Sequence, residues 1–136
     1  FLDFDFAHPQ HNILSITAFV TSCEALSIGV KAGLDARTMI DVINTSTGRN
    51  SATVDKFPKA ILPRTFQYGG PLSIGVKDVE LYLQLARSSH MPAFVGSTVA
   101  NLFNLVADRL GPEADYSNMI KVFEEWGGGI VVGDTA

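Results

Sequence analysis

An adjacent lysine and aspartate, Lys77 and Asp78, are the residues in this sequence that most suggest chemistry. They fall near the start of a strongly apolar stretch with helical spacing, where adjacent side chains point in different directions and do not pair with each other. The helix dipole favours a carboxylate in the first turn and disfavours a cation there. Two interpretations of Lys77 therefore stay open: a ligand for an anionic group, or a solvated lysine.

His8 and His11 form a second arrangement, because residues three apart share one face of a helix. Asp3 and Asp5 are close to them in the sequence, so the four side chains resemble part of a metal-ligand set. A zinc site needs three or four ligands with supporting hydrogen bonds. We favour the simpler interpretation, a pair of polar residues at the start of a helix, and predict no metal.

The usual motifs for nucleotide binding and nucleophilic catalysis are missing. Gly127-Gly128-Gly129 has no Lys-Ser/Thr pair and does not join a strand to a helix, so it is interpreted as a helix stop. Gly69-Gly70-Pro71 opens a helix whose N-terminus can take an anion, but a simple loop is favoured. Cys23 lies among apolar residues in mid-helix and is predicted to be a buried, inert thiol.

Helical periodicity begins after Pro9. From Ile13 to Val30 apolar residues recur every three or four positions and small residues fill the other face, which is typical of a helix buried between neighbours. This helix would span about 20 residues, with Pro9 in its first turn and Gly33 as its stop. In the first six residues phenylalanine alternates with aspartate, which predicts a short strand or an arm that packs on a partner.

The later elements are also predicted to be helices. Asp35 is expected to cap a second helix, and a weaker stretch, broken by two prolines, follows from Ser51 to Leu62. Further helices are expected over Leu72 to Ser88, Phe94 to Leu110 and Tyr116 to Trp126, with an apolar tail that docks on the fold. We therefore predict an all-α bundle of five or six helices, built on one long N-terminal helix and without a sheet.

The composition limits the class of protein. The chain has 136 residues, of which 46% are hydrophobic and 18% charged, and this suits one folded domain. A net charge of −4 without a basic stripe argues against a nucleic-acid partner. One cysteine excludes an intrachain disulfide and fits a reducing, cytoplasmic location. No uninterrupted apolar run approaches about 18 residues, so neither a transmembrane helix nor a membrane partner is expected.

Five segments, in order, resemble the C-terminal all-helical domain of the β-hydroxyacid dehydrogenases, the family of 3-hydroxyisobutyrate dehydrogenase, with 6-phosphogluconate dehydrogenase as a relative. The resemblance covers roughly residues 12 to 126. It rests on Asn12-Ile13-Leu14, on the loop from Val42 to Asn50, on Lys77-Asp78, on Met91-Pro92 and on Asp115-Tyr116-Ser117.

The resemblance implies a role for each matching residue. In that family a separate Rossmann domain binds NAD or NADP, and the helical domain supplies substrate contacts and most of the dimer interface. Asn12 matches the substrate-binding asparagine, and His8 stands one turn earlier, where a lysine acts as general acid and base; histidine can exchange a proton near pH 7. Lys77 and Asp78 match the pair that reaches the cofactor. Gly70 stands where a phenylalanine is common.

By this resemblance the chain is part of an NAD(P)-dependent oxidoreductase that acts on a small β-hydroxy acid or its semialdehyde as a homodimer or tetramer. Residues 1–11 would be an arm or linker, and residues 12–136 the helical substrate-binding and dimerisation domain. The Rossmann domain would be absent from this chain, and the chain alone inactive. Two alternatives stay open: a stand-alone helical module without catalysis, and a related imine reductase, suggested by His8.

Overall fold

The computed structural model describes residues 2–135, with side chains from residue 7 onward, and these residues form helices joined by loops. The helices are α1 (Leu2–Lys31), α2 (Ala36–Asn44), a π-helix (Ala52–Ile61), α3 (Leu72–Ser88), α4 (Phe94–Leu110), a short 3₁₀ helix (Tyr116–Asn118) and α5 (Met119–Trp126). Among the described residues the only β pairing is an isolated bridge between Pro71 and Asp115. The predicted all-α fold, built on one long helix, is confirmed.

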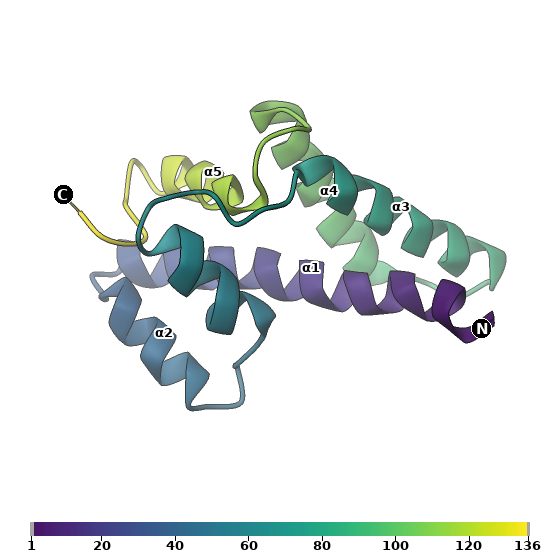
Figure 1. The fold of residues 1–136 in the computed structure, drawn as a ribbon, viewed down its shortest axis with the longest axis horizontal. Coiled ribbons are helices and arrows are strands. Elements are labelled where there is room, and N and C mark those ends of the chain that lie inside the picture. Colours follow the sequence, from purple (N-terminus) through teal and green to yellow (C-terminus); the bar gives the residue numbers. More distant parts are fainter. Residues whose placement is uncertain (1, 136) are drawn as a thin grey trace.

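Helix α1 runs the length of the molecule, and the other helices lie along it (Figure 1). Its buried side chains recur every three or four residues, at Ile13, Ile16, Phe19, Cys23 and Leu26. By length and composition alone, the helical segment Ala7–Lys31 could also cross a membrane. The sequence prediction of no transmembrane helix considered only uninterrupted apolar runs. Here the apolar residues of α1 pack against α3, α4 and α5, as in the core helix of a folded domain.

The N-terminal segment differs from the prediction. The backbone is helical from Leu2, so a strand is wrong for residues 2–11, and Pro9 lies inside α1 and not in its first turn. Once a helix is nucleated, each added residue gains one hydrogen bond, and a short polar–apolar alternation does not outweigh that gain. The expected packing of the first phenylalanines on a partner concerns side chains outside the described residues.

Local chemistry ends α1 and begins α2 as predicted. Gly33 follows α1 with φ 97°, a left-handed conformation that glycine adopts without strain, and its N–H donates to the carbonyl of Val30. Asp35 caps α2 by accepting hydrogen bonds from the N–H and the hydroxyl of Thr38, each at 2.9 Å.

The segment Ala52–Ile61 is a π-helix and not the weak α-helix expected. The N–H of Leu62 donates to the carbonyl of Phe57, five residues earlier, at 2.8 Å. Residues four apart stay near one face of this helix, as they do in an α-helix. Two such rows are buried: Ala52, Lys56 and Ala60, and beside them Thr53, Phe57 and Ile61. Lys56 therefore lies on the buried side of this helix.

The C-terminal tail docks on α5, which confirms that prediction. Val132 is completely buried, and its N–H donates to the Glu124 carboxylate at 2.7 Å. Arg64 holds the same carboxylate with two hydrogen bonds of 2.6 and 3.1 Å. An ion pair between Asp134 and Arg37 fastens the tail to α2.

Candidate functional site

The residues expected to handle the substrate lie on one stripe of α1. At about 100° per residue, His8, Asn12, Ser15 and Phe19 fall within about 60° of one another around the helix axis. His8 is exposed, Asn12 and Ser15 are half-buried, and Phe19 is completely buried. The stripe therefore leads from the protein surface into the core.

A small pocket lies at the inner end of this stripe, between α1, the π-helix and the start of α3. Its volume is about 190 Å³, which suits a group of a few heavy atoms and not a whole drug-sized ligand. We call it the Lys56 pocket, and it is lined by Ser15, Lys56, Tyr68, Gly69, Gly70, Pro71, Ile74 and Tyr116.

Lys56 is the one charged residue that lines this pocket. The residue is 9% exposed, and its ammonium nitrogen lies 5.7 Å from the centre of the Phe19 ring and 5.2 Å from that of Tyr68. Burial lowers the pKa of Lys56 from its ordinary value, although the nearby Asp55 carboxylate opposes this shift.

The Asp55 carboxylate is occupied by other groups. It pairs with Lys59 at 2.6 Å and accepts a hydrogen bond from the Tyr68 hydroxyl. These two hydrogen bonds lower the pKa of Asp55, and the bond to Asp55 raises the pKa of Tyr68 to about 12. Lys56 forms no hydrogen bond or ion pair with any described residue.

Asp115 holds the loop that forms one wall of the pocket. Its carboxylate accepts hydrogen bonds from the N–H groups of Tyr68 at 3.2 Å, Gly69 at 2.8 Å and Ser117 at 3.0 Å. Burial raises the pKa of Asp115, but the hydrogen bonds outweigh burial and the pKa lies below its ordinary value. The Asp-x-Ser segment therefore acts by positioning a loop.

Tyr116 connects this pocket to α3. Its ring packs on the rings of Phe19 and Phe103, with centroids 5.7 and 5.4 Å away. Its hydroxyl fills the space beside Gly75, where a Cβ atom would overlap it. Burial raises the pKa of Tyr116, and the carboxylate of Asp78 raises it further. Asp78 thus acts on a residue of the core.

Lys77 lies on the opposite side of α3 from the core. Gly75 and Val79 are buried, and each lies two residues, or about 200° of rotation, from Lys77. Lys77 is exposed, one helical turn after Ile74, which lines the Lys56 pocket. As predicted, Lys77 and Asp78 do not pair with each other.

The remaining candidates are structural in the described part of the chain. Cys23 is completely buried, as predicted, and burial raises the pKa of its thiol. Gly127 follows α5 directly, as expected of a helix stop. No cluster of three or more histidine, cysteine or acidic side chains occurs from residue 7 onward. The side chains of Asp3 and Asp5 lie outside the described residues.

Sequence reasoning missed Lys56. The stretch around it was interpreted with the 3.6-residue period of an α-helix, in which Pro58 is an interruption. The available signal was the spacing of four that links Lys56 to Ala52 and Ala60, both completely buried.

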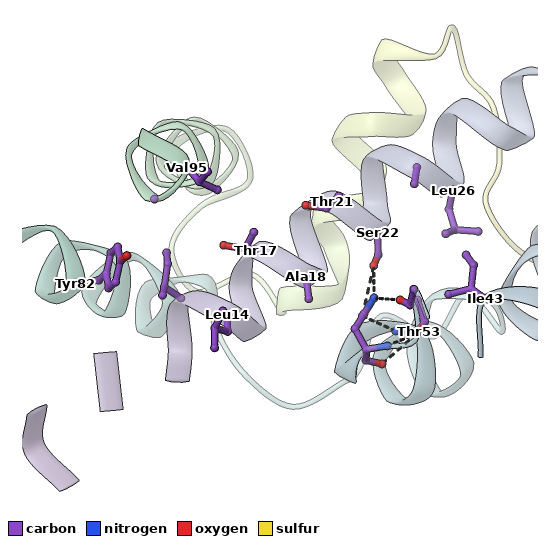
Figure 2. Close-up of a pocket in the computed structure, with 15 residues that line it drawn as sticks. Leu14, Thr17, Ala18, Thr21, Ser22, Leu26, Ile43, Thr53, Tyr82 and Val95 are labelled. Carbon is purple, nitrogen blue, oxygen red and sulfur yellow. Dashed lines mark hydrogen bonds between the residues drawn. The ribbon is translucent and has the colours of Figure 1, made fainter. Parts of the chain in front are cut away.

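A second, larger hollow runs along the outer side of α1. Its volume is about 680 Å³. Leu14, Thr17, Ala18 and Thr21 line it from α1, with Tyr82 of α3 and Val95 of α4 beside them (Figure 2). We call this the outer groove. Leu14 and Val95 are 71% and 67% exposed, so the groove presents apolar side chains to its surroundings.

Known proteins resemble this chain over most of its length. The chain is 33% identical over 124 residues to 2-(hydroxymethyl)glutarate dehydrogenase of Eubacterium barkeri, which covers 90% of this chain and 41% of that protein. It is 24% identical to mitochondrial 3-hydroxyisobutyrate dehydrogenase of Rattus norvegicus, over 85% of this chain and 36% of that protein. The chain thus spans about two fifths of these relatives.

The fold also matches solved structures. A 3-hydroxyisobutyrate dehydrogenase from Salmonella typhimurium superposes with a TM-score of 0.75 at 24% identity, over 84% of this chain and 40% of that one. The enzyme of the same name from Mycobacterium tuberculosis gives 0.75 at 23% identity, over 85% and 42%.

A family model described as the NAD-binding domain of NADP-dependent 3-hydroxyisobutyrate dehydrogenase matches residues 10–123. This match confirms the link to NAD or NADP that the sequence motifs implied. Because it covers most of the chain, the chain belongs to this family of helical NAD(P)-linked dehydrogenase domains.

Proposed function

We propose that this chain is the C-terminal helical domain of an NAD(P)-dependent oxidoreductase that acts on a small β-hydroxy acid or its semialdehyde. Beyond family membership, one observation carries the proposal. Ser15 and Ile74 both line the Lys56 pocket, and each lies one helical turn from a predicted site residue, Asn12 on α1 and Lys77 on α3. A substrate beside this pocket would therefore be within reach of both helices.

In this proposal Asn12 binds the substrate, because its amide can both donate and accept hydrogen bonds. His8 lies one turn earlier on the same stripe and exchanges the proton of the substrate hydroxyl, since an imidazole both accepts and donates protons. The two residues lie where α1 approaches the surface, the position needed to meet a second domain.

The fold suits a domain that makes only some of the contacts to a dinucleotide. Lys77 is exposed and has no ion-pair partner from residue 7 onward, so its ammonium is available to a negative or carbonyl group of NAD(P). The described backbone contains no strand leading into a glycine-rich helix N-terminus, the arrangement that holds a pyrophosphate. When bound, the nicotinamide supplies or accepts the hydride. Lys77 would contact it from one side, and most of the binding would come from a Rossmann domain.

We further propose that the outer groove forms the interface between two copies of the chain. Phe94 is 82% exposed next to Val95 and adds a large apolar side chain to the same region. Exposed apolar patches of this kind mark interaction surfaces. Leu14→Glu should shift the native protein from dimer to monomer by light scattering, whereas Glu24→Gln on the same helix should leave it dimeric.

The experiment that tests the function uses the native protein that contains this chain. Its NAD⁺- and NADP⁺-dependent oxidation of 3-hydroxy carboxylic acids should be measurable, and Asn12→Ala should lower kcat/KM by about a hundredfold. Gln10→Ala, two residues away on a different face of α1, is the matched control and should change little. Reduction of imines without turnover of any hydroxy acid would favour the imine reductase, and absence of hydride transfer would favour the non-catalytic module.

A further inference from the structure

Lys56 differs from every other buried charge in the described part of the chain. Glu124, the one buried carboxylate, is held by two hydrogen bonds from Arg64. Lys56 is the one buried lysine or arginine, yet it forms no hydrogen bond or ion pair. Buried charges in proteins are normally paired, because removal from water is costly.

The groups around Lys56 do not supply that partner. The Asp55 carboxylate is held by Lys59 and by the Tyr68 hydroxyl. The rings of Phe19 and Tyr68 attract the cation but accept no hydrogen bond from it at 5.7 and 5.2 Å. An ammonium has three N–H donors, and no described residue accepts a hydrogen bond from this one, so its donors are available to water or to a ligand in the pocket.

The rest of the pocket suits a small anion. The hydroxyl of Ser15, a lining residue, can donate a hydrogen bond, although it also lies 3.4 Å from the hydroxyl of Ser51. At Gly70 no atom lies within 4 Å of the position that a Cβ would occupy, so the pocket is open on the side of this loop. A volume of about 190 Å³ holds a carboxylate and the carbon atoms next to it.

We propose that the Lys56 pocket binds a carboxylate of the substrate and selects hydroxy acids that carry a carboxylate remote from the reacting hydroxyl. This inference rests on the proposed function, which places the hydroxyl near Asn12. The pocket lies beside Ser15 and Phe19, one to two turns further along α1, or about 5–10 Å along the axis. That separation exceeds the span of a simple β-hydroxy acid and fits a hydroxy dicarboxylate.

Binding is tested first on the chain itself, independently of turnover. Glutarate, a plain dicarboxylate, should shift the amide NMR signals of Gly69 and Gly70. Lys56→Met should weaken glutarate binding by at least about tenfold, whereas Lys31→Met, which removes an exposed lysine at the end of α1, should not. Gly70→Val, which fills the open side and leaves Lys56 intact, should also weaken it. Inorganic phosphate that binds as tightly as glutarate would overturn a carboxylate site.

Selectivity is then tested on the native protein with its cofactor. We expect kcat/KM for a hydroxy dicarboxylate to exceed that for the matching hydroxy monocarboxylate. Lys56→Met should reduce this preference by about tenfold and leave kcat/KM for the monocarboxylate unchanged. If the protein turns over hydroxy acids but Lys56→Met does not alter the preference for the dicarboxylate, this inference would be overturned and the proposed function would remain. If glutarate binding depends on Lys56 but the native protein turns over no hydroxy acid, only the proposed function would be refuted.

Discussion

Replacing Lys56 by methionine should make the fold more stable even though it removes the proposed binding group. Methionine keeps an unbranched chain of similar length, so the packing of the lysine stem is preserved. Burying an unpaired ammonium costs several kcal/mol, and each cation–π contact returns only about 0.5–1 kcal/mol. The lowered pKa of Lys56 indicates that the folded state disfavours the protonated form of its side chain. Because solvent reaches the open pocket and screens part of this cost, we expect a gain of about 1 kcal/mol.

The pH dependence of this gain follows from the direction of the pKa shift. A lowered pKa means that the folded state disfavours protonated Lys56, so the wild type carries the full cost at pH 7. The cost begins to fall as pH reaches the folded-state pKa, which lies below the ordinary value of 10.5, and it is lost by the time pH passes that ordinary value. Tyr68, with a pKa of about 12, stays protonated over that range. The advantage of Lys56→Met should therefore shrink towards pH 10.

Urea unfolding of the wild type and Lys56→Met at pH 7 and at pH 10 measures both effects. Lys31→Met is the control, because its side chain is exposed at the end of α1, so little change is expected. A Lys56→Met protein less stable than the wild type at pH 7 would refute the reasoning, since the ammonium would then have a stabilising partner in the fold.

Three further substitutions test the scaffold of the site by urea unfolding. Gly75→Ala should destabilise by about 1–2 kcal/mol, because a Cβ there meets Phe103 at 2.5 Å and outweighs the better helix propensity; a gain in stability would contradict this. Asp115→Asn should cost about 2 kcal/mol at pH 7. The folded-state pKa of Asp115 is lowered, so the stabilisation by its carboxylate is present above the ordinary aspartate pKa and is lost as pH falls through the folded-state pKa. If acid destabilised the wild type and Asp115→Asn equally, this explanation would be wrong. Glu124→Gln should cost about 3 kcal/mol by leaving Arg64 without its carboxylate, and an unchanged midpoint would be inconsistent with a buried ion pair.

Most of the fold was predictable because the signals are local. The cap at Asp35 and the stop at Gly33 depend on a few neighbouring residues, and the structure has both. The start of α1 was not predictable from the first residues alone. Their polar–apolar alternation indicated a strand, but the gain from extending an existing helix decided the outcome.

Only the site residues that belong to family motifs could be predicted from the sequence. The positions of Asn12 and Lys77, on helices that flank one pocket, agree with their expected roles, and those roles stay predictions. Asp78 was predicted not to pair with Lys77, but its sequence position did not indicate that its carboxylate raises the pKa of Tyr116 in the core. Lys56 escaped notice because Pro58 was interpreted as a break in the helix, and because a lysine is normally assigned to the surface.

The intact mass of the native protein in its source cell tests the central claim most directly. If this chain is the helical part of a two-domain dehydrogenase, the native mass should be more than twice the 14.6 kDa of these residues. A native mass near 14.6 kDa would contradict the account, because a helical chain of this size has no Rossmann domain to hold the dinucleotide.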